Sequence, residues 1–196
     1  MEINPRYSRA MDAVAELLSK LRIEWIFVGG VARAAWLGSS VEGGSIDVVA
    51  LMQPQQKNQV AMMASNRGFR VDRDEIERSE ELDLIPLHFA DVRIHVLVAS
   101  NALYAKMITA ARVVHELRVA SREDLALLLT LAEDQEAVRE LMAVSDFDHG
   151  RYNETLLSIG LGHAVIPTPS EARGRDPLRD REGDSSPSSA ARNDKS

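Results

Sequence analysis

An aspartate in an otherwise apolar segment is the first candidate for chemistry in this sequence. Asp47 stands in GGSIDVVALM, whose branched side chains predict a buried strand. A carboxylate in such a strand costs free energy unless it is paired, hydrogen-bonded or bound to a metal. Two interpretations stay open: Asp47 belongs to a functional site, or it caps a neighbouring loop. Its same-face neighbour two residues on is Val49, so this strand offers one carboxylate.

Two consecutive glycines are the second candidate. Gly29 and Gly30 follow the apolar segment WIFV and precede a segment of helical composition, VARAAWL. Glycines at such a junction let backbone N–H groups and a helix N-terminus face a phosphate, although a plain tight turn explains the same residues. Neither the G-x-G-x-x-G pattern nor the G-x-x-x-x-G-K-[ST] loop occurs, so we expect neither a dinucleotide-binding fold nor a P-loop.

A histidine in a predicted strand is the third candidate. The alternation in VRIHVLV puts His95 and Arg93 on one face, where a lone histidine is usually a surface or structural residue. His88, in the preceding predicted strand, can lie near it across a hairpin, but the sequence does not fix the register. The remaining histidines show no H-E-x-x-H or similar ligand spacing, so no zinc site is expected: His115, His149 and His163.

The composition narrows the class of protein. The 196 residues are 45% hydrophobic, which suits a globular domain, and they include no cysteine, which excludes disulfides, thiolate catalysis and zinc fingers. No apolar run approaches the roughly 18 residues of a membrane span, and the charged N-terminus lacks a signal peptide's apolar region. We therefore expect a cytoplasmic protein without membrane contact. The net charge of −7 argues against duplex DNA as a partner.

Hydrophobic periodicity predicts the elements that position these candidates. Helices and strands alternate in the first 100 residues, and the chain after Asn101 is expected to be helical throughout, with a capping box at Ser121-x-x-Asp124. Strands are predicted at 25–28, 46–52, 69–72, 84–89 and 92–98, the last two as a hairpin around Ala90-Asp91. Helices are predicted at 7–21, 31–37, 54–63 and 152–161.

One domain and a tail follow from this order. Residues 1–164 are expected to form the domain, with an α/β half at about 1–100 and a helical half at about 101–164. Residues 165–196 are rich in proline and serine, and their acidic and basic residues are equal in number. Such a segment buries too little apolar surface to offset its chain entropy, so we expect a disordered tail.

The arrangement of these motifs resembles the polymerase-β-like nucleotidyltransferase superfamily. It is similar to the small bacterial abortive-infection (AbiEii-type) toxins and related families, over roughly residues 20–145. The matching pieces are FVGG at 27–30, SIDVV at 45–49, VRIHVL at 92–97 and EDL at 123–125. The resemblance implies an α/β (α+β) fold, with a nucleotidyltransferase-like mixed sheet followed by a helical half. It implies nucleotide binding by four residues: Gly29, Gly30, Arg33 and Ser45.

The sequence departs from this superfamily at the catalytic positions. Asp47 matches the first acidic residue of the superfamily's motifs, while Val49 and His95 replace the second and third. Leu129 replaces the basic residue expected after the EDL motif, and the arginine common in the loop before Asp47 is missing. Mg²⁺ prefers oxygen ligands, so valine supplies nothing and an imidazole is a poor substitute. Asp47 and His95 are thus the catalytic candidates, Asp47 is the one metal candidate, and a Mg²⁺ site is expected to be weak or absent.

Three functions follow as alternatives. The first is a catalytically impaired protein, a pseudoenzyme, that binds a nucleotide or a protein partner in a toxin–antitoxin or defence setting. The second is an active Mg²⁺-dependent nucleotidyltransferase acting on protein or tRNA, whose site is completed by a carboxylate of Asp91, Glu42 or Asp72. The third is an α/β interaction protein without nucleotide chemistry, in which Gly29, Gly30 and Asp47 are structural.

Overall fold

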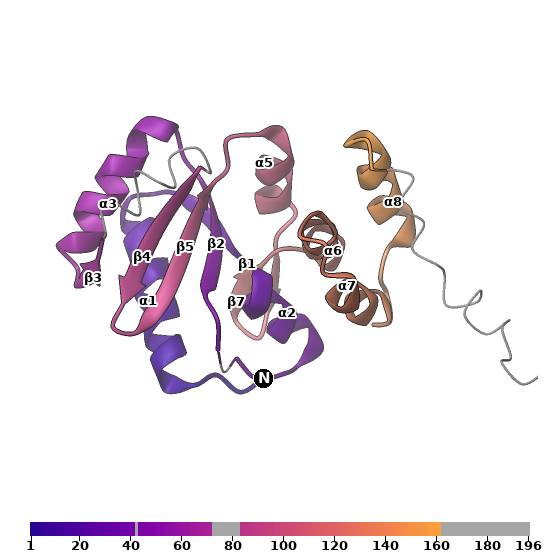
Figure 1. The fold of residues 1–196 in the computed structure, drawn as a ribbon, viewed down its shortest axis with the longest axis horizontal. Coiled ribbons are helices and arrows are strands. Elements are labelled where there is room, and N and C mark those ends of the chain that lie inside the picture. The colour runs from indigo at the N-terminus through magenta and orange to yellow at the C-terminus, as the bar shows by residue number, and fades with distance from the viewer. Residues whose placement is uncertain (42, 72–82, 162–196) are drawn as a thin grey trace, which may run out of the picture.

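The computed structural model describes residues 1–41, 43–71 and 83–161 (Figure 1). The helices are α1 (Pro5–Lys20), α2 (Gly29–Leu37), α3 (Lys57–Ser65), α5 (Ala102–Thr109), α6 (Arg122–Leu131), α7 (Gln135–Met142) and α8 (His149–Ser158), with a 3-10 turn at Pro54–Gln56. The strands are β1 (Glu24–Val28), β2 (Ile46–Leu51), β3 (Phe69–Arg70), β4 (Leu84–Phe89), β5 (Val92–Val98), β6 (Arg112–Val114) and β7 (Leu117–Val119). The predictions for Glu42, Asp72 and the tail at 165–196 lie outside the described residues.

The strands form one mixed sheet in the order β3-β4-β5-β2-β1-β7-β6. The pairs β2–β5 and β1–β7 are parallel, and the remaining neighbours are antiparallel. The two strands that carry the chemical candidates, β2 and β5, are therefore direct neighbours inside the sheet. The predicted fold class, a mixed α/β sheet followed by a helical C-terminal half, is confirmed.

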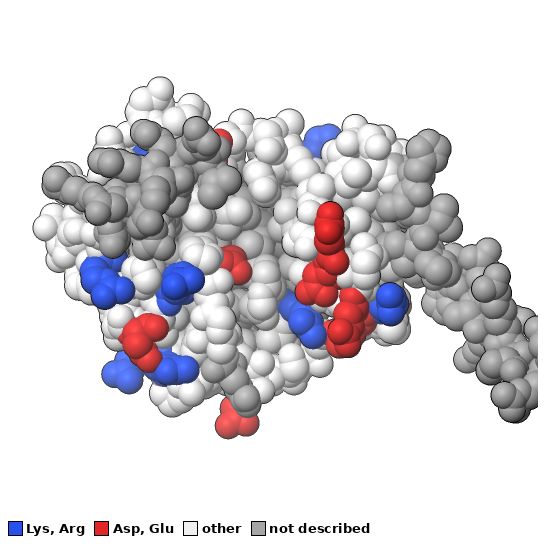
Figure 2. Space-filling view, in the orientation of Figure 1, with Lys and Arg blue, Asp and Glu red and all other residues white. Residues whose placement is uncertain are grey.

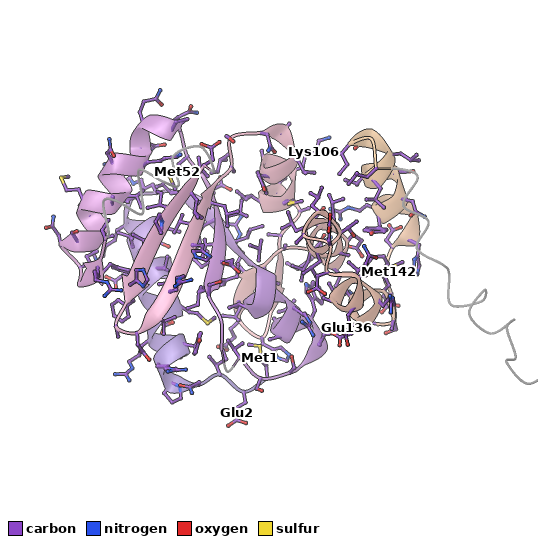
Figure 3. All side chains as sticks on the ribbon, viewed as in Figure 1. Met1, Glu2, Met52, Lys106, Glu136 and Met142 are labelled. Atoms are coloured by element: carbon purple, nitrogen blue, oxygen red, sulfur yellow. The ribbon has the colours of Figure 1, made fainter. Side chains whose placement is uncertain are left out.

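Helices pack against the sheet, and three of them lie beyond one of its ends. In α1 the spacing of the buried residues gives one apolar stripe, from Tyr7 through Met11 and Val14 to Leu18, as the sequence predicts. Asn4 caps this helix, because its side chain accepts from the N–H of Arg6 at 3.1 Å. Helices α6, α7 and α8 gather beyond the β7 end of the sheet, far from α3 and β3 (Figure 1). Side chains fill the space between these layers (Figure 3).

The sequence predicts a chain that is helical throughout after Asn101, and this prediction is wrong. Two three-residue strands, β6 and β7, form a hairpin there, and Val119 of β7 extends the sheet by pairing with Phe27 of β1. His115 and Glu116 join the strands with φ values of 48° and 68°, the left-handed pair typical of a two-residue turn. Strands of three residues are too short to show an alternating pattern, so periodicity cannot separate them from the flanking helices.

Smaller boundary differences have local causes. Helix α2 begins at Gly29, two residues before the predicted start, because the glycine itself makes the turn out of β1. Strand β3 is limited to Phe69–Arg70 within the described residues, and α8 starts at His149 because Asp148 caps it, its side chain accepting from the N–H of Arg151 at 2.9 Å. Among the described residues, no helix is both long and apolar enough to cross a membrane.

Candidate functional site

Asp47 and His95 meet side by side on neighbouring strands. They are register partners in the parallel pair β2–β5, and His95 Nδ1 lies 2.9 Å from Asp47 Oδ1. A carboxylate only accepts hydrogen bonds, so the imidazole donates through Nδ1–H, which leaves Nε2 as the acceptor nitrogen of the neutral ring. The two side chains are 25% and 28% exposed, respectively, so the pair is open to solvent at the sheet surface. The structure thus brings the two catalytic candidates together.

The position of Gly29 has no room for a side chain, because the carboxylate of Asp47 lies beside it. Val28, the last residue of β1, is the register partner of Asp47, so Gly29 passes directly beside the carboxylate. Gly29 has φ of +57°, and a Cβ added there would stand 2.5 Å from Asp47 Oδ2. Any side chain would therefore strain the backbone and displace the aspartate. A Cβ added at Gly30 would have nothing within 4 Å, so the structure requires glycine at position 29 but leaves room for a side chain at position 30.

Ser45, the residue immediately before β2, contacts Asp47 through its side chain. Its Oγ–H donates to Asp47 Oδ1 at 2.9 Å, because residues two apart share a face of the extended chain. The loop before it is anchored to α1, since the hydroxyl of Tyr7 donates to the carbonyl of Gly44 at 3.0 Å. Val49, on the other side of Asp47, is fully buried in the hydrophobic core. Ser45, rather than Val49, therefore occupies the position from which a second carboxylate could reach the site.

A hollow of about 320 Å³ opens beside the start of α2. Three of the four predicted nucleotide-binding residues line it: Gly30, Arg33 and Ser45. Arg33 also pairs with Glu140 of α7, with Nη2 at 2.7 Å and Nε at 3.0 Å from the same carboxylate oxygen, Oε2. Both side chains of this pair are about two-fifths exposed, at 39% and 41%, so the ion pair contributes little to stability and a competing anion can reach the guanidinium.

A second hollow, of about 500 Å³, lies on the sheet surface next to the first. Ser45 borders both hollows, and the second is also lined by His95, Arg93, His88, Arg70, Asp91 and Gly44. Asp91, one of the carboxylates considered for completing the site, lies 2.8 Å from Arg6 of α1 and forms an ion pair with it. The other two, Glu42 and Asp72, lie outside the described residues. Sequence reasoning missed Arg70 and Arg93 as lining residues. The strand alternation around His95 gives a signal for Arg93, whereas Arg70 comes from β3 and is brought here by the register of the sheet.

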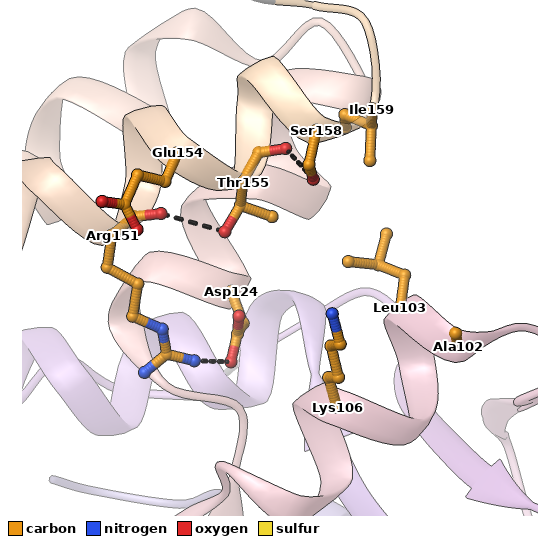
Figure 4. A pocket seen from close by; sticks show the side chains of 9 residues that line it. All are labelled: Ala102, Leu103, Lys106, Asp124, Arg151, Glu154, Thr155, Ser158 and Ile159. Carbon is orange, nitrogen blue, oxygen red and sulfur yellow. Dashed lines mark hydrogen bonds and ion pairs between the residues drawn. The ribbon is translucent and has the colours of Figure 1, made fainter.

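The EDL motif at 123–125 holds helices α6 and α8 together through Asp124. Asp124 is 6% exposed, and its carboxylate accepts from Ser121 Oγ at 2.7 Å and from Arg151 Nη2 at 2.8 Å. Ser121 also accepts from the N–H of Asp124, so the predicted N-cap of α6 is confirmed. The basic partner thus comes from α8 and not from the position of Leu129 on α6. Figure 4 shows Asp124 and Arg151 at the wall of a hollow between α5, α6 and α8, with Lys106 reaching into it from α5.

The donor atoms around Asp47 do not fit a Mg²⁺ ion held by protein ligands. They are one carboxylate, one hydroxyl and one imidazole nitrogen, whereas Mg²⁺ demands a near-octahedral shell of oxygen atoms. Within residues 1–41, 43–71 and 83–161, no three histidine, aspartate or glutamate side chains are grouped closely enough to hold a metal ion. The described residues therefore provide a polar site with a single carboxylate.

Comparison with known proteins gives the fold a precedent. No family model matches the chain, and no curated protein matches it by sequence. Among solved structures, the lincomycin-bound lincosamide antibiotic adenylyltransferase LnuA matches with a TM-score of 0.51 at 9% identity, covering 74% of this chain and 100% of that one. ANT(2'')-Ia, in complex with adenylyl-2''-tobramycin, matches with a TM-score of 0.47 at 15% identity, covering 78% of this chain and 88% of that one. The likeness to LnuA shows that this chain has a nucleotidyltransferase-like fold.

Proposed function

We propose that this protein binds a nucleotide beside Asp47 and transfers nucleotidyl groups weakly or not at all. The observation that carries the proposal is the Asp47–His95 hydrogen bond of 2.9 Å. It joins Asp47 to an imidazole, at the position where the resemblance implies another carboxylate. The scaffold of a transferase is therefore combined with an incomplete acidic set.

The nucleotide's phosphates are proposed to bind in the hollow at the start of α2. Backbone N–H groups at a helix N-terminus favour an anion, and Gly30 leaves room for one because nothing stands within 4 Å of its missing side chain. Arg33 supplies a guanidinium and Ser45 a hydroxyl to the same hollow. Gly29 shapes the turn and lets Asp47 approach the backbone. Asp47 is the residue proposed to contact any cation that a bound nucleotide brings with it.

A second candidate function is an active transferase that modifies protein or tRNA. The same hydrogen bond favours it, because a carboxylate that holds Nδ1–H of an imidazole leaves Nε2 facing outward as a general base. In that case Asp47 positions His95, and His95 accepts the proton of the attacking hydroxyl. The resemblance to AbiEii-type toxins extends both candidates to a toxin–antitoxin or defence setting with a protein partner.

Nucleotide-dependent thermal stability tests the proposal. A ligand that binds only the native state raises the melting temperature, so ATP, GTP, CTP or UTP should stabilise the protein. Arg33→Gln should reduce that gain, whereas Glu140→Gln, which breaks the same ion pair but keeps the arginine, should preserve it. No stabilisation by any of the four nucleotides would contradict the proposal. Incorporation of labelled nucleotide into protein or tRNA separates the two candidates, since only the active transferase gives product.

A further inference from the structure

We propose that the hollow between α5, α6 and α8 is a binding site for a small zwitterion, a molecule with an acidic group at one end and an amino group at the other. The hollow has a volume of about 400 Å³, and Figure 4 shows the side chains that line it. It shares none of these residues with the two hollows that Ser45 borders. The inference therefore goes beyond the proposed nucleotide site and does not depend on it.

Two opposite charges line this hollow without pairing with each other. Lys106 reaches into it from α5, and Glu154 stands on α8 (Figure 4). Both residues are exposed, and neither forms an ion pair within the part of the chain that the structure describes. Figure 2 shows charged side chains of both signs over this end of the molecule. The ammonium and the carboxylate therefore each keep the capacity for a charge-assisted hydrogen bond to a ligand.

The ion pair in the wall of the hollow leaves these two charges as the ones available to a ligand. The carboxylate of Asp124 accepts from Arg151 Nη2 at 2.8 Å and from Ser121 Oγ at 2.7 Å, and its side chain is 8% exposed. Its charge is thus balanced within the protein, and the guanidinium is held against it. The pair shapes the hollow, and Lys106 and Glu154 give it one free charge of each sign.

The α8 wall of the hollow accepts hydrogen bonds. The hydroxyl of Thr155 donates to the carbonyl of Arg151 at 2.9 Å, and the hydroxyl of Ser158 donates to the carbonyl of Thr155 at 2.7 Å. Both hydroxyl hydrogens are used within the helix, so each Oγ can only accept a hydrogen bond from a ligand. Glu154 and Ser158 are four residues apart and share one face of α8. An ammonium group, which only donates, is the group that this wall suits.

The α5 wall sets the opposite requirement. The ammonium of Lys106 only donates, so it suits a carboxylate. Leu103 of α5 and Ile159, the residue after α8, are half-buried and line the same hollow. Their apolar surface favours hydrocarbon between the two charged ends of the ligand. The chemical class is therefore an amino acid whose amino and acid groups are separated by a hydrocarbon chain.

Ligand-observed NMR with three unbranched amino acids of increasing chain length tests the site: β-alanine, γ-aminobutyrate and ε-aminohexanoate. At least one should bind the parent, and more tightly than butyrate or butylamine, which carry one charge each. Lys106→Gln and Glu154→Gln should each weaken binding by about tenfold or more, because each removes a charge-assisted hydrogen bond. Lys20→Gln in α1 and Glu136→Gln in α7 make the same changes of charge away from the hollow and should bind as the parent does.

Reversing one charge at a time gives a gain of binding that loss of the fold cannot produce. Glu154→Lys leaves two free cations and should bind the dicarboxylate glutarate more tightly than the parent does. Lys106→Glu leaves two free carboxylates and should favour the diamine cadaverine in the same way. No binding of the parent to any of the three amino acids, equal binding of butyrate, or unchanged affinity in either glutamine variant would overturn the proposal. Failure of nucleotide binding is detected separately, since Arg33→Gln acts in another hollow and leaves these titrations unchanged.

Discussion

Ser45 and Asp47 stand two residues apart on one face of the chain, with Ser45 Oγ 2.9 Å from Asp47 Oδ1. Val49, at the same spacing on the other side, is fully buried. This contrast decides where a carboxylate could be added to the site. An acidic side chain at position 45 would meet Asp47 at the surface, whereas one at position 49 would be enclosed in the hydrophobic core.

The first prediction adds carboxylates at the surface. The double variant Ser45→Asp with His95→Asp should place three carboxylates together, which repel one another in chelator and are stabilised by Mg²⁺. Its melting temperature should therefore fall in EDTA and rise with Mg²⁺, while that of the parent changes little. Thermal unfolding in the two buffers measures the difference.

Val49→Asp with His95→Asp is the matched control for this prediction. A carboxylate enclosed at position 49 should lower the melting temperature in both buffers, because the core supplies no partner for the charge. Recovery of this control by Mg²⁺, with no response from the Ser45→Asp with His95→Asp variant, would show that the acidic position is Val49 after all.

The second prediction compares the two glycines. Gly29→Ala should destabilise the protein by about 2 kcal/mol or more, because its φ of +57° strains a side chain and the new Cβ meets Asp47 Oδ2. Gly30→Ala has open space and a helical backbone, so it should be neutral or stabilising by up to about 1 kcal/mol. Denaturant unfolding measures both. Equal destabilisation by the two variants would contradict the close approach of Gly29 to Asp47.

The third prediction concerns the contact that joins α8 to α6. Arg151→Met leaves the buried carboxylate of Asp124 without its cation, which should cost about 2 kcal/mol, at the low end for a buried pair because the Arg151 side chain is 35% exposed. Adding Asp124→Asn to that variant should recover part of the loss, since no buried charge then remains. Arg139→Met, on an exposed site of α7, should change stability by less than about 0.5 kcal/mol. A loss in Arg139→Met as large as in Arg151→Met would argue against a specific role for the pair.

The fourth prediction uses pH. Burial raises the pKa of Tyr152 above its ordinary value of 10.0, with the hydrogen bond to Thr130 opposing the shift. A raised pKa in the folded state means that the unfolded chain loses this proton first, so stability falls as the pH rises above about 10. Tyr152→Phe should be less stable at neutral pH by about 1 kcal/mol, because it removes the 2.7 Å contact with Thr130 Oγ1.

The dependence of the melting temperature on pH in the alkaline range tests this prediction. Between about pH 9 and pH 11, the melting temperature of the parent should fall more steeply than that of Tyr152→Phe, which has no phenol to ionise at this position. Parallel slopes would mean that Tyr152 is as accessible in the folded protein as in the unfolded chain.

Strong local patterns explain what the sequence predicts well. Strands 25–28, 46–52, 84–89 and 92–98 are apolar or regularly alternating, and each corresponds to a strand in the sheet. The resemblance makes Asp47 and His95 joint catalytic candidates, whereas alternation alone fixes the face of a side chain but not its partner on the next strand. That partner depends on register, which the whole sheet determines.

Register and long-range packing explain what the sequence does not predict. Arg70, His88 and Arg93 come into line across three strands, and no spacing along the chain reports this alignment. Arg151 likewise reaches Asp124 from a helix that begins 25 residues later in the sequence, at His149. Such contacts follow from tertiary packing, so neither periodicity nor a local motif reveals them.

Nucleotide titration with and without Mg²⁺ tests the central claim most directly. Calorimetry with the best stabilising nucleoside triphosphate should give affinities in Mg²⁺ and in EDTA that agree within about tenfold, because no cluster of three metal-binding side chains occurs in the described part of the chain to hold the cation. Chromatography of the same samples should find the nucleotide intact and no nucleotidylated product. Binding that is lost in EDTA, together with nucleotide turnover in Mg²⁺, would contradict the account and show a complete metal site.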